Sequence, residues 1–300
     1  MNLLITGAWQ NATQHIDELN RMGHCVRFMQ WEKDELPCPT AWVEGVIGNG
    51  FFLHHDIAQF TNLRYIQLTS AGYDRVDMDY VQTHGITIHN AGDTYAVPMA
   101  EHALCGVLML YRQMPKFLAN QQQKLWNKER FMPELSGKHV LILGCGAVGQ
   151  ACAGRFAAMG CTVTGIARTA RSIPGYAAVH SLADLPTLLP SADVVILALP
   201  ATPDTKQLFN AETFERMKPT AVLVNIARGE LVDESALSAA LFEGKLAGAV
   251  LDVFAEEPLS ANSTLWDMPN VFITPHNSFV GEGNAHRLSY NIISNLSQSS

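Results

Sequence analysis

The sequence predicts an α/β fold built from two doubly wound parallel sheets, and three observations lead to this prediction. Short apolar runs rich in β-branched residues alternate with helical patterns along the whole chain, which is typical of parallel α/β folds. In the second half these runs are apolar throughout rather than alternating, as in strands that are covered on both faces. The 300 residues suffice for two domains of roughly 150 residues each.

The first domain is predicted from five apolar runs within residues 1–94. They are Asn2–Thr6, Cys25–Met29, Gly45–Ile47, Tyr65–Leu68 and Ile86–His89. Helical patterns lie between them, around Thr13–Met22, Ile57–Phe60 and Val76–Thr83. This alternation predicts a first parallel sheet with helices on its faces.

The second, larger domain begins with a long helical stretch from about Val97 to Lys124, which Pro115 is expected to kink or break. Six predicted strands follow: His139–Leu143, Thr162–Ile166, Val194–Leu199, Ala221–Ile226, Gly248–Val253 and Val271–Thr274. The tail after His276 is too short for a domain of its own, so we expect it to pack on the first one. The predicted organisation is a domain of residues 95–276 inserted in a domain formed by residues 1–94 and 277–300.

Composition and charge exclude several classes of protein. With 48% hydrophobic residues the chain can bury a large core, and disorder is excluded. A formal net charge of −8 argues against nucleic-acid partners and anionic membrane surfaces. No apolar run reaches the ~18 residues of a membrane span, since Ala103–Tyr111 is ended by Arg112. Neither a signal peptide nor a C-x-x-C pair is found, so we expect a cytoplasmic protein with reduced cysteines.

A dinucleotide-binding motif follows the first strand of the second domain. Gly144, Gly146 and Gly149 form a complete Gly-x-Gly-x-x-Gly between the strand HVLIL and a helix predicted over Gln150–Met159, the context that the motif requires. The glycines permit a tight turn, close approach to a pyrophosphate and close packing of helix on strand. The amides around Ala147 and Val148 would point toward phosphate.

The residues after the next strand predict which cofactor is bound. An acidic residue that binds the adenosine ribose is expected about 20 residues after the motif, but Ala167 stands there, followed by Arg168, Thr169 and Arg171. A small residue followed by arginines favours a 2′-phosphate by charge and by bidentate geometry. We therefore predict NADP, with NAD as the alternative if these arginines form only a solvated loop.

Three kinds of reactive side chain follow later strands of this domain. Arg228 follows AVLVNIA, Glu256 and Glu257 follow GAVLDVF, and His276 follows VFITP. Ligands of doubly wound folds bind at the carboxyl ends of the strands. A guanidinium, a carboxylate and an imidazole at this edge suit the reduction of a 2-oxo acid, because they can bind the carboxylate, polarise the carbonyl and deliver a proton.

With these motifs the sequence resembles the D-isomer-specific 2-hydroxyacid dehydrogenases over most of its length. The matching stretches, in the family's order, are LTSAGYDRVD, GCGAVG, LALPATPDT, VNIARGELVDESAL, GAVLDVFAEEPL and ITPH. The resemblance implies a Rossmann cofactor domain inserted in a flavodoxin-like substrate domain.

The same resemblance implies roles for individual residues. It makes Arg228 the substrate-binding arginine, His276 the general acid/base and Glu257 the carboxylate partner of His276. It places Asp252 near the nicotinamide carboxamide. Further matches are the cofactor contacts Leu199, Thr205 and Ile226, and the amides of Ala71 and Gly72 that hold the substrate carboxylate.

The implied activity is reversible reduction of a 2-oxo acid to a D-2-hydroxy acid with NADPH. The small Ala167 is similar to the glyoxylate and hydroxypyruvate reductase branch, whereas Glu257 disfavours the formate dehydrogenases, which carry an amide there. The alternatives are an NAD-dependent D-2-hydroxyacid dehydrogenase and a nucleotide-sensing corepressor of the same fold. No motif determines which 2-oxo acid is the substrate; side chains such as Asn49, Phe51 or Tyr73 are candidates.

Other polar residues are interpreted without a catalytic role. The adjacent His54 and His55 point apart and lack partner ligands, so no metal site is predicted. The pair Glu101 and His102 suggests packing or a hydrogen bond between domains, and Glu256 a solvated loop. The apolar spacing of Met99, Leu104 and Leu108 indicates core or a subunit contact, and with the resemblance it predicts a homodimer.

Overall fold

The computed structural model describes residues 1–298, and in it the chain divides into two compact units. The first comprises Met1–Tyr95 and the residues from Gly281 onward, and the second comprises Ala96–Val280. Every strand pair in both sheets is parallel, which confirms the predicted fold class. Within residues 1–298, no helix is long and apolar enough to cross a membrane.

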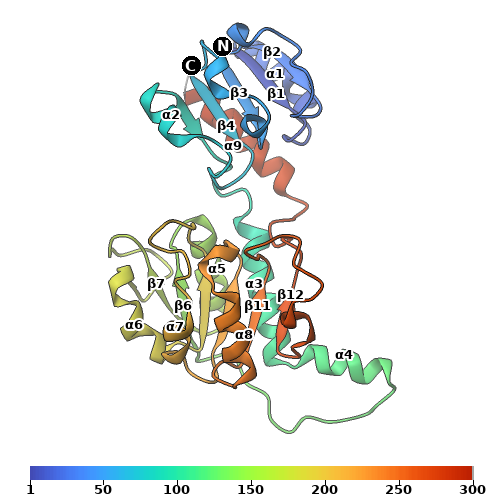
Figure 1. Cartoon of the computed structure of the whole chain (residues 1–300), viewed down its shortest axis with the longest axis vertical. Helices are drawn as coiled ribbons and strands as arrows, with labels where there is room; N and C mark the ends of the chain where they lie inside the picture. The colour runs from blue at the N-terminus through green and yellow to red at the C-terminus, as the bar shows by residue number, and fades with distance from the viewer. Residues whose placement is uncertain (299–300) are drawn as a thin grey trace. The chain divides into compact units, whose positions relative to one another are not determined.

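The sheet of the first unit has the strand order β2-β1-β3-β4-β5 (Figure 1), the order of flavodoxin-like folds. Its strands are β1 (Asn2–Thr6), β2 (Cys25–Met29), β3 (Gly45–Gly48), β4 (Tyr65–Leu68) and β5 (Thr87–His89). Its helices are α1 (Ile16–Arg21), α2 (Met78–Thr83) and α9 (Asn284–Gln298). The predicted helix Ile57–Phe60 is only a 3₁₀ turn, Ile57–Gln59.

The tail of the chain completes the core of the first unit. Helix α9 carries Leu288, Ile292 and Leu296 into a buried cluster with Trp9. The Trp9 indole N–H donates to Ser289 Oγ at 2.9 Å. The residues after Gly281 thus supply one helix layer of the first sheet, although they follow the second unit in sequence.

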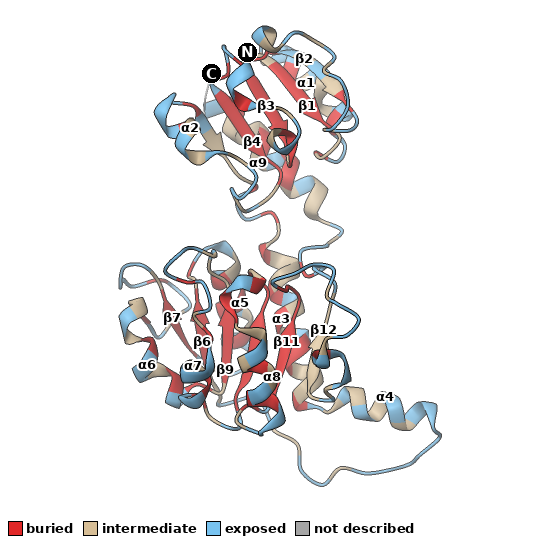
Figure 2. Cartoon of the chain, viewed as in Figure 1, coloured by how far each residue is buried: buried red, intermediate tan, exposed pale blue. Residues whose placement is uncertain are grey.

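The sheet of the second unit has the order β12-β11-β10-β9-β6-β7-β8, which is the Rossmann order extended by one strand. Its strands are β6 (His139–Leu143), β7 (Thr162–Ile166), β8 (Ala178–His180), β9 (Val194–Leu197), β10 (Val222–Asn225), β11 (Gly248–Leu251) and β12 (Val271–Ile273). Figure 2 shows that most of these strands are buried. The short edge strand β8 was not among the predicted strands.

The helices of the second unit also differ in part from the prediction. They are α3 (Ala96–Tyr111), α4 (Met114–Gln122), α5 (Ala147–Ala158), α6 (Leu185–Leu188), α7 (Ala211–Glu215) and α8 (Glu234–Phe242). The long helical stretch breaks at Gln113, which is left-handed with φ 51°. Pro115 lies just after this break, in the first turn of α4, where its missing N–H costs no hydrogen bond.

Four strands of this sheet end one or two residues before their predicted ends. The reason is that the apolar residues of each run continue beyond the last residue that is hydrogen-bonded to a neighbouring strand. Leu199, Ile226 and Val253 lie beyond β9, β10 and β11 but remain half-buried or buried. The chain has left the sheet at these points and forms the turns of its carboxyl edge. Those turns carry the reactive side chains.

Candidate active site

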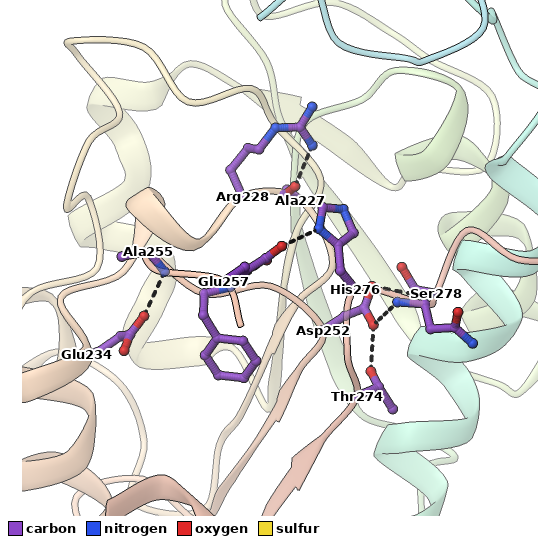
Figure 3. Close-up of polar contacts among 11 residues, drawn as sticks. Ala227, Arg228, Glu234, Asp252, Ala255, Glu257, Thr274, His276 and Ser278 are labelled. Atoms are coloured by element: carbon purple, nitrogen blue, oxygen red, sulfur yellow. Dashed lines mark hydrogen bonds and ion pairs between the residues drawn. The ribbon is translucent and has the colours of Figure 1, made fainter. Parts of the chain in front are cut away.

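Three neighbouring strands bring the predicted catalytic residues to one edge of the second sheet. β10, β11 and β12 lie side by side and run parallel. Arg228, Glu257 and His276 follow these strands in that order, and Figure 3 shows the three side chains gathered at the edge.

The imidazole of His276 is held by the carboxylate of Glu257. His276 Nδ1 lies 2.7 Å from Glu257 Oε2, and the two side chains are 44% and 36% exposed. The other oxygen of Glu257 accepts the amide of Phe254 at 3.1 Å, which fixes the carboxylate in turn. Because a carboxylate can only accept here, Nδ1 carries a proton, and Nε2 is left to donate or to accept one.

The turn that carries Arg228 is fixed by a buried asparagine. Asn225, at the end of β10, is 1% exposed. Its Nδ2 donates to the carbonyl of Arg228 at 2.9 Å, and its Oδ1 accepts the amide of Ala227 at 3.2 Å. The half-buried Arg228 side chain donates from Nη1 to the carbonyl of Ala227 at 2.7 Å. Asn225 was not predicted, although a polar residue at the end of the run VLVN was its signal.

Asp252 is wholly buried, and its side chain holds the His276 turn. Oδ1 accepts the hydroxyl of Thr274 at 2.6 Å and the amide of Asn277 at 2.8 Å, while Oδ2 accepts the amide of Ser278 at 2.9 Å. Burial alone would raise the pKa of Asp252, but the hydrogen bonds from Ser278, Thr274 and Asn277 outweigh it and hold the pKa below its ordinary value. In this structure the carboxylate is therefore engaged by the turn that carries His276.

The glycine motif forms a tight turn before α5. Gly144 has φ 101°, and a Cβ there would lie 2.3 Å from the carbonyl oxygen of Ala198. A Cβ on Gly149 would lie 1.9 Å from the carbonyl oxygen of Gly144. At Gly146, by contrast, a Cβ would meet nothing within 4 Å, so the backbone is open at the N-terminus of a twelve-residue helix. This geometry fits a pyrophosphate. The helix starts at Ala147, inside the motif and before its predicted start.

The residues predicted to choose the cofactor follow β7, the neighbour of β6 in the sheet. Arg168, Thr169 and Arg171 are exposed, and Ala167 is half-buried beside Cys145 of the glycine turn. Burial raises the pKa of the Cys145 thiol, and the positive charge of Arg171 opposes this in part. Because β7 adjoins β6, these residues follow the strand next to the one that leads into the glycine turn.

The structure places the remaining predicted cofactor residues in structural contacts. Thr205 Oγ1 donates to the carbonyl of Pro200 at 2.9 Å and accepts the amide of Thr202 at 2.8 Å, which closes the loop after β9. Ile226 is 1% exposed and packs in the core, and Leu199 is half-buried.

The predicted substrate-binding turn lies in the first unit, after β4. Ser70 Oγ donates to the carbonyl of Gly72 at 3.0 Å, and Asn90 Nδ2 donates to the carbonyl of Ala71 at 2.7 Å. Among the described residues, neither the Ala71 amide nor the Gly72 amide donates a hydrogen bond. Both N–H groups of this turn are therefore left unengaged by the described residues.

Several polar residues lie outside the site. Glu256 is exposed. His55 Nε2 contacts the carbonyl of Glu32 at 2.8 Å, and its ring stacks on Phe51. No group of three or more potential ligands that could hold a metal ion occurs within residues 1–298. His102 on α3 is hydrogen-bonded to another residue of the second unit, since its Nε2 lies 3.1 Å from Thr274 Oγ1.

Fold and site together define a doubly wound α/β protein with a paired imidazole and carboxylate beside an arginine at the carboxyl edge of its second sheet. Residues 104–278 match the model of the D-isomer specific 2-hydroxyacid dehydrogenase, NAD binding domain. The chain belongs to this family.

Individual relatives support the same assignment. The chain is 38% identical over 222 residues to the glyoxylate reductase of Pyrococcus furiosus, an alignment that covers 71% of this chain and 66% of that protein. It is 34% identical over 217 residues to the D-3-phosphoglycerate dehydrogenase of Synechocystis sp., covering 72% of this chain and 39% of that protein. The alignments therefore span less than two thirds of these relatives.

A solved structure matches nearly the whole chain. The D-isomer specific 2-hydroxyacid dehydrogenase from Xanthobacter autotrophicus Py2, in complex with NADPH and MES, is 28% identical with a TM-score of 0.80. The match covers 99% of this chain and 95% of that one. The fold of both units is therefore that of a 2-hydroxyacid dehydrogenase.

Proposed function

We propose that the chain is a reductase of 2-oxo acids that forms D-2-hydroxy acids reversibly with NADPH, of the glyoxylate and hydroxypyruvate reductase kind. The observation that carries this proposal is the 2.7 Å hydrogen bond between His276 Nδ1 and Glu257 Oε2 on the edge that also holds Arg228. The relative named glyoxylate reductase supports the substrate class.

Each residue has a definite task in this proposal. When bound, the nicotinamide cofactor supplies the hydride for the carbonyl carbon. His276 donates a proton from Nε2 to the carbonyl oxygen as that oxygen becomes an alkoxide. Glu257 stabilises the charged imidazole before the transfer. Arg228 binds the substrate carboxylate and polarises the carbonyl, and the amides of Ala71 and Gly72 are further donors to the carboxylate.

A conservative change at Arg228 tests the site. Lysine keeps the charge but cannot make two parallel hydrogen bonds to a carboxylate. We expect Arg228→Lys to lower kcat/KM for glyoxylate and hydroxypyruvate about 100-fold, which is about 2.7 kcal/mol, while NADPH binding measured by fluorescence titration stays within about twofold. Turnover close to that of the natural protein would remove Arg228 from the substrate site. An absence of turnover with any of a panel of 2-oxo acids would overturn the proposed activity itself.

The preference for NADPH rests on the missing acid at Ala167 and on the exposed Arg168 and Arg171 that follow it. NADPH in the related Xanthobacter structure supports it. We expect kcat/KM to be at least ~10-fold higher with NADPH than with NADH, equivalent to 1.4 kcal/mol. The double variant Arg168→Ala/Arg171→Ala should lose most of this preference.

A matched control is Arg216→Ala, which also removes an exposed arginine. Arg216 Nη2 lies 2.9 Å from Oε1 of Glu212 on α7. It should leave the ratio of the two cofactors unchanged. A natural protein that prefers NADH would contradict the prediction from Ala167.

We also propose that the protein forms a homodimer through the segment around α3 and α4. Among the described residues α4 buries none of its own side chains, and Trp126 and Phe131 in the segment after it are 90% and 82% exposed. Leu104 and Leu108 of α3 line an apolar hollow that Met114, at the start of α4, also lines. Exposed apolar side chains that gather on one surface are typical of protein interfaces. Sedimentation should therefore give twice the chain mass, and Trp126→Asp should shift the measured mass toward that of the monomer.

A further inference from the structure

A chain of hydrogen bonds leads from helix α3 to the turn that carries His276. His102 Nε2 lies 3.1 Å from Thr274 Oγ1, and Thr274 Oγ1 lies 2.6 Å from Asp252 Oδ1. His102 is half-buried on α3, next to the ring of Phe272, and Asp252 is fully buried. All members of the chain belong to the second unit.

The direction of these hydrogen bonds follows from the charge of Asp252. Its pKa is held low, so the carboxylate is ionised near neutral pH and can only accept. Thr274 has one hydroxyl proton, which it gives to Asp252, so its oxygen must accept from His102. Burial lowers the pKa of His102, although Asp252 opposes this in part. The ring is therefore neutral and carries its proton on Nε2.

This chain orients Asp252 against the backbone of His276 and of the two residues that follow it. The carboxylate accepts the amides of Asn277 and Ser278, while the main-chain oxygen of Asp252 accepts the amide of His276 at 2.8 Å. His276 itself is left-handed, with φ 49°. For a residue other than glycine such a conformation is strained and persists only where its surroundings determine it.

We infer that His102 and Thr274 are positioning residues for His276, acting through Asp252. The inference rests on the proposed function, in which His276 delivers a proton. Thr274 holds Oδ1 at the angle that binds Asn277, and His102 prevents the hydroxyl of Thr274 from turning away. Neither residue touches the Glu257 carboxylate or the imidazole itself in this structure. Their loss would displace the imidazole, and misplacement of a reacting group by about 1 Å can cost ~100-fold in rate.

The test compares Thr274→Val with Thr274→Ser. Valine keeps the shape but loses the hydroxyl, so kcat for reduction should fall about tenfold while the Kd for NADPH stays within about twofold. Serine keeps the hydroxyl and should restore kcat to within about twofold of the natural protein. His102→Phe, which keeps an aromatic ring but has no Nε2 donor, should give a smaller loss of kcat and serves if Thr274→Val does not fold.

A matched control separates positioning from stability. Thr164 on β7 makes an equivalent threonine–histidine hydrogen bond, since its Oγ1 lies 2.9 Å from His139 Nε2 in the same sheet. Thr164→Val should lower the thermal midpoint by a similar amount but leave kcat within about twofold. The inference is wrong if Thr274→Val behaves as Thr164→Val should, that is, if it has the kcat of the natural protein and only a lower stability.

Amide hydrogen exchange provides a readout that does not depend on the proposed activity. The amides of Asn277 and Ser278 should exchange about tenfold faster in Thr274→Val than in the natural protein or in Thr164→Val. If no 2-oxo acid is reduced but exchange accelerates in this way, the proposed function fails while the positioning of the His276 turn stands. Unchanged exchange at both amides would overturn the positioning.

Discussion

The two units of this protein each contain a turn that is held by a single carboxylate. In the first unit, Glu32 accepts the hydroxyl of Thr6 at 2.9 Å and the amides of Asn49 and Gly50 at 2.6 and 2.7 Å. Thr6 ends β1, and the two amides directly follow β3, the neighbour of β1. The carboxylate thus joins two strand ends at the carboxyl edge of the sheet.

The second unit repeats this plan with Asp252, which joins the hydroxyl of Thr274 to the amides of Asn277 and Ser278. The difference lies in burial and in what the turn carries. Asp252 is fully buried, whereas Glu32 is half-buried. Water can replace a lost partner of Glu32 but not of Asp252. The turn of His276 is consequently the more tightly determined of the two.

The largest expected difference between the two turns is in catalysis. We expect His276→Ala to lower kcat by 100-fold to 10,000-fold, the usual contribution of a positioned general acid. Asn49→Ala, in the turn of the first unit, should lower kcat less than about tenfold and change instead the relative KM values among 2-oxo acids. Steady-state kinetics with NADPH checks both. A comparable loss of kcat in the two variants would show that the turns do not differ in function.

The next difference is in the free energy of unfolding. Asp252→Ala leaves the Thr274 hydroxyl and the amides of Asn277 and Ser278 without their acceptor. Ser278 is buried, and a buried unsatisfied group costs about 1–3 kcal/mol. We expect a total loss of about 3 kcal/mol or more, against about 1 kcal/mol for Glu32→Ala, as measured by urea denaturation. Equal losses would mean that water reaches both turns alike.

The smallest expected effect is a pH dependence of stability that belongs to Asp252. Its pKa is lower in the folded protein than in the unfolded chain, since its hydrogen bonds outweigh the effect of burial. The contribution of ionised Asp252 to the free energy of unfolding is therefore fully present above about pH 4. It is lost as the pH falls through the lowered pKa of the folded protein. The gap in unfolding free energy between the natural protein and Asp252→Asn should stay constant from about pH 8 to 5 and shrink below pH 4. A gap that widens in acid would contradict the lowered pKa.

The sequence by itself determined the strands and the motifs, because these depend on neighbouring residues. Apolar runs predicted β1, β4, β6 and β7 to the residue, since each is buried along most of its length. The spacing of Gly144, Gly146 and Gly149 likewise implied a turn before a helix, because it concerns six consecutive residues.

Only the tertiary structure decided which polar groups meet. His102 and Thr274 are 172 positions apart in sequence and Thr274 and Asp252 are 22 apart, so no local pattern predicts that they touch. Asp252 is still predicted to lie beside the cofactor, and only the structure shows that the His276 turn engages its carboxylate. The reason is physical: a buried carboxylate must find donors wherever the packing of strands and helices brings them.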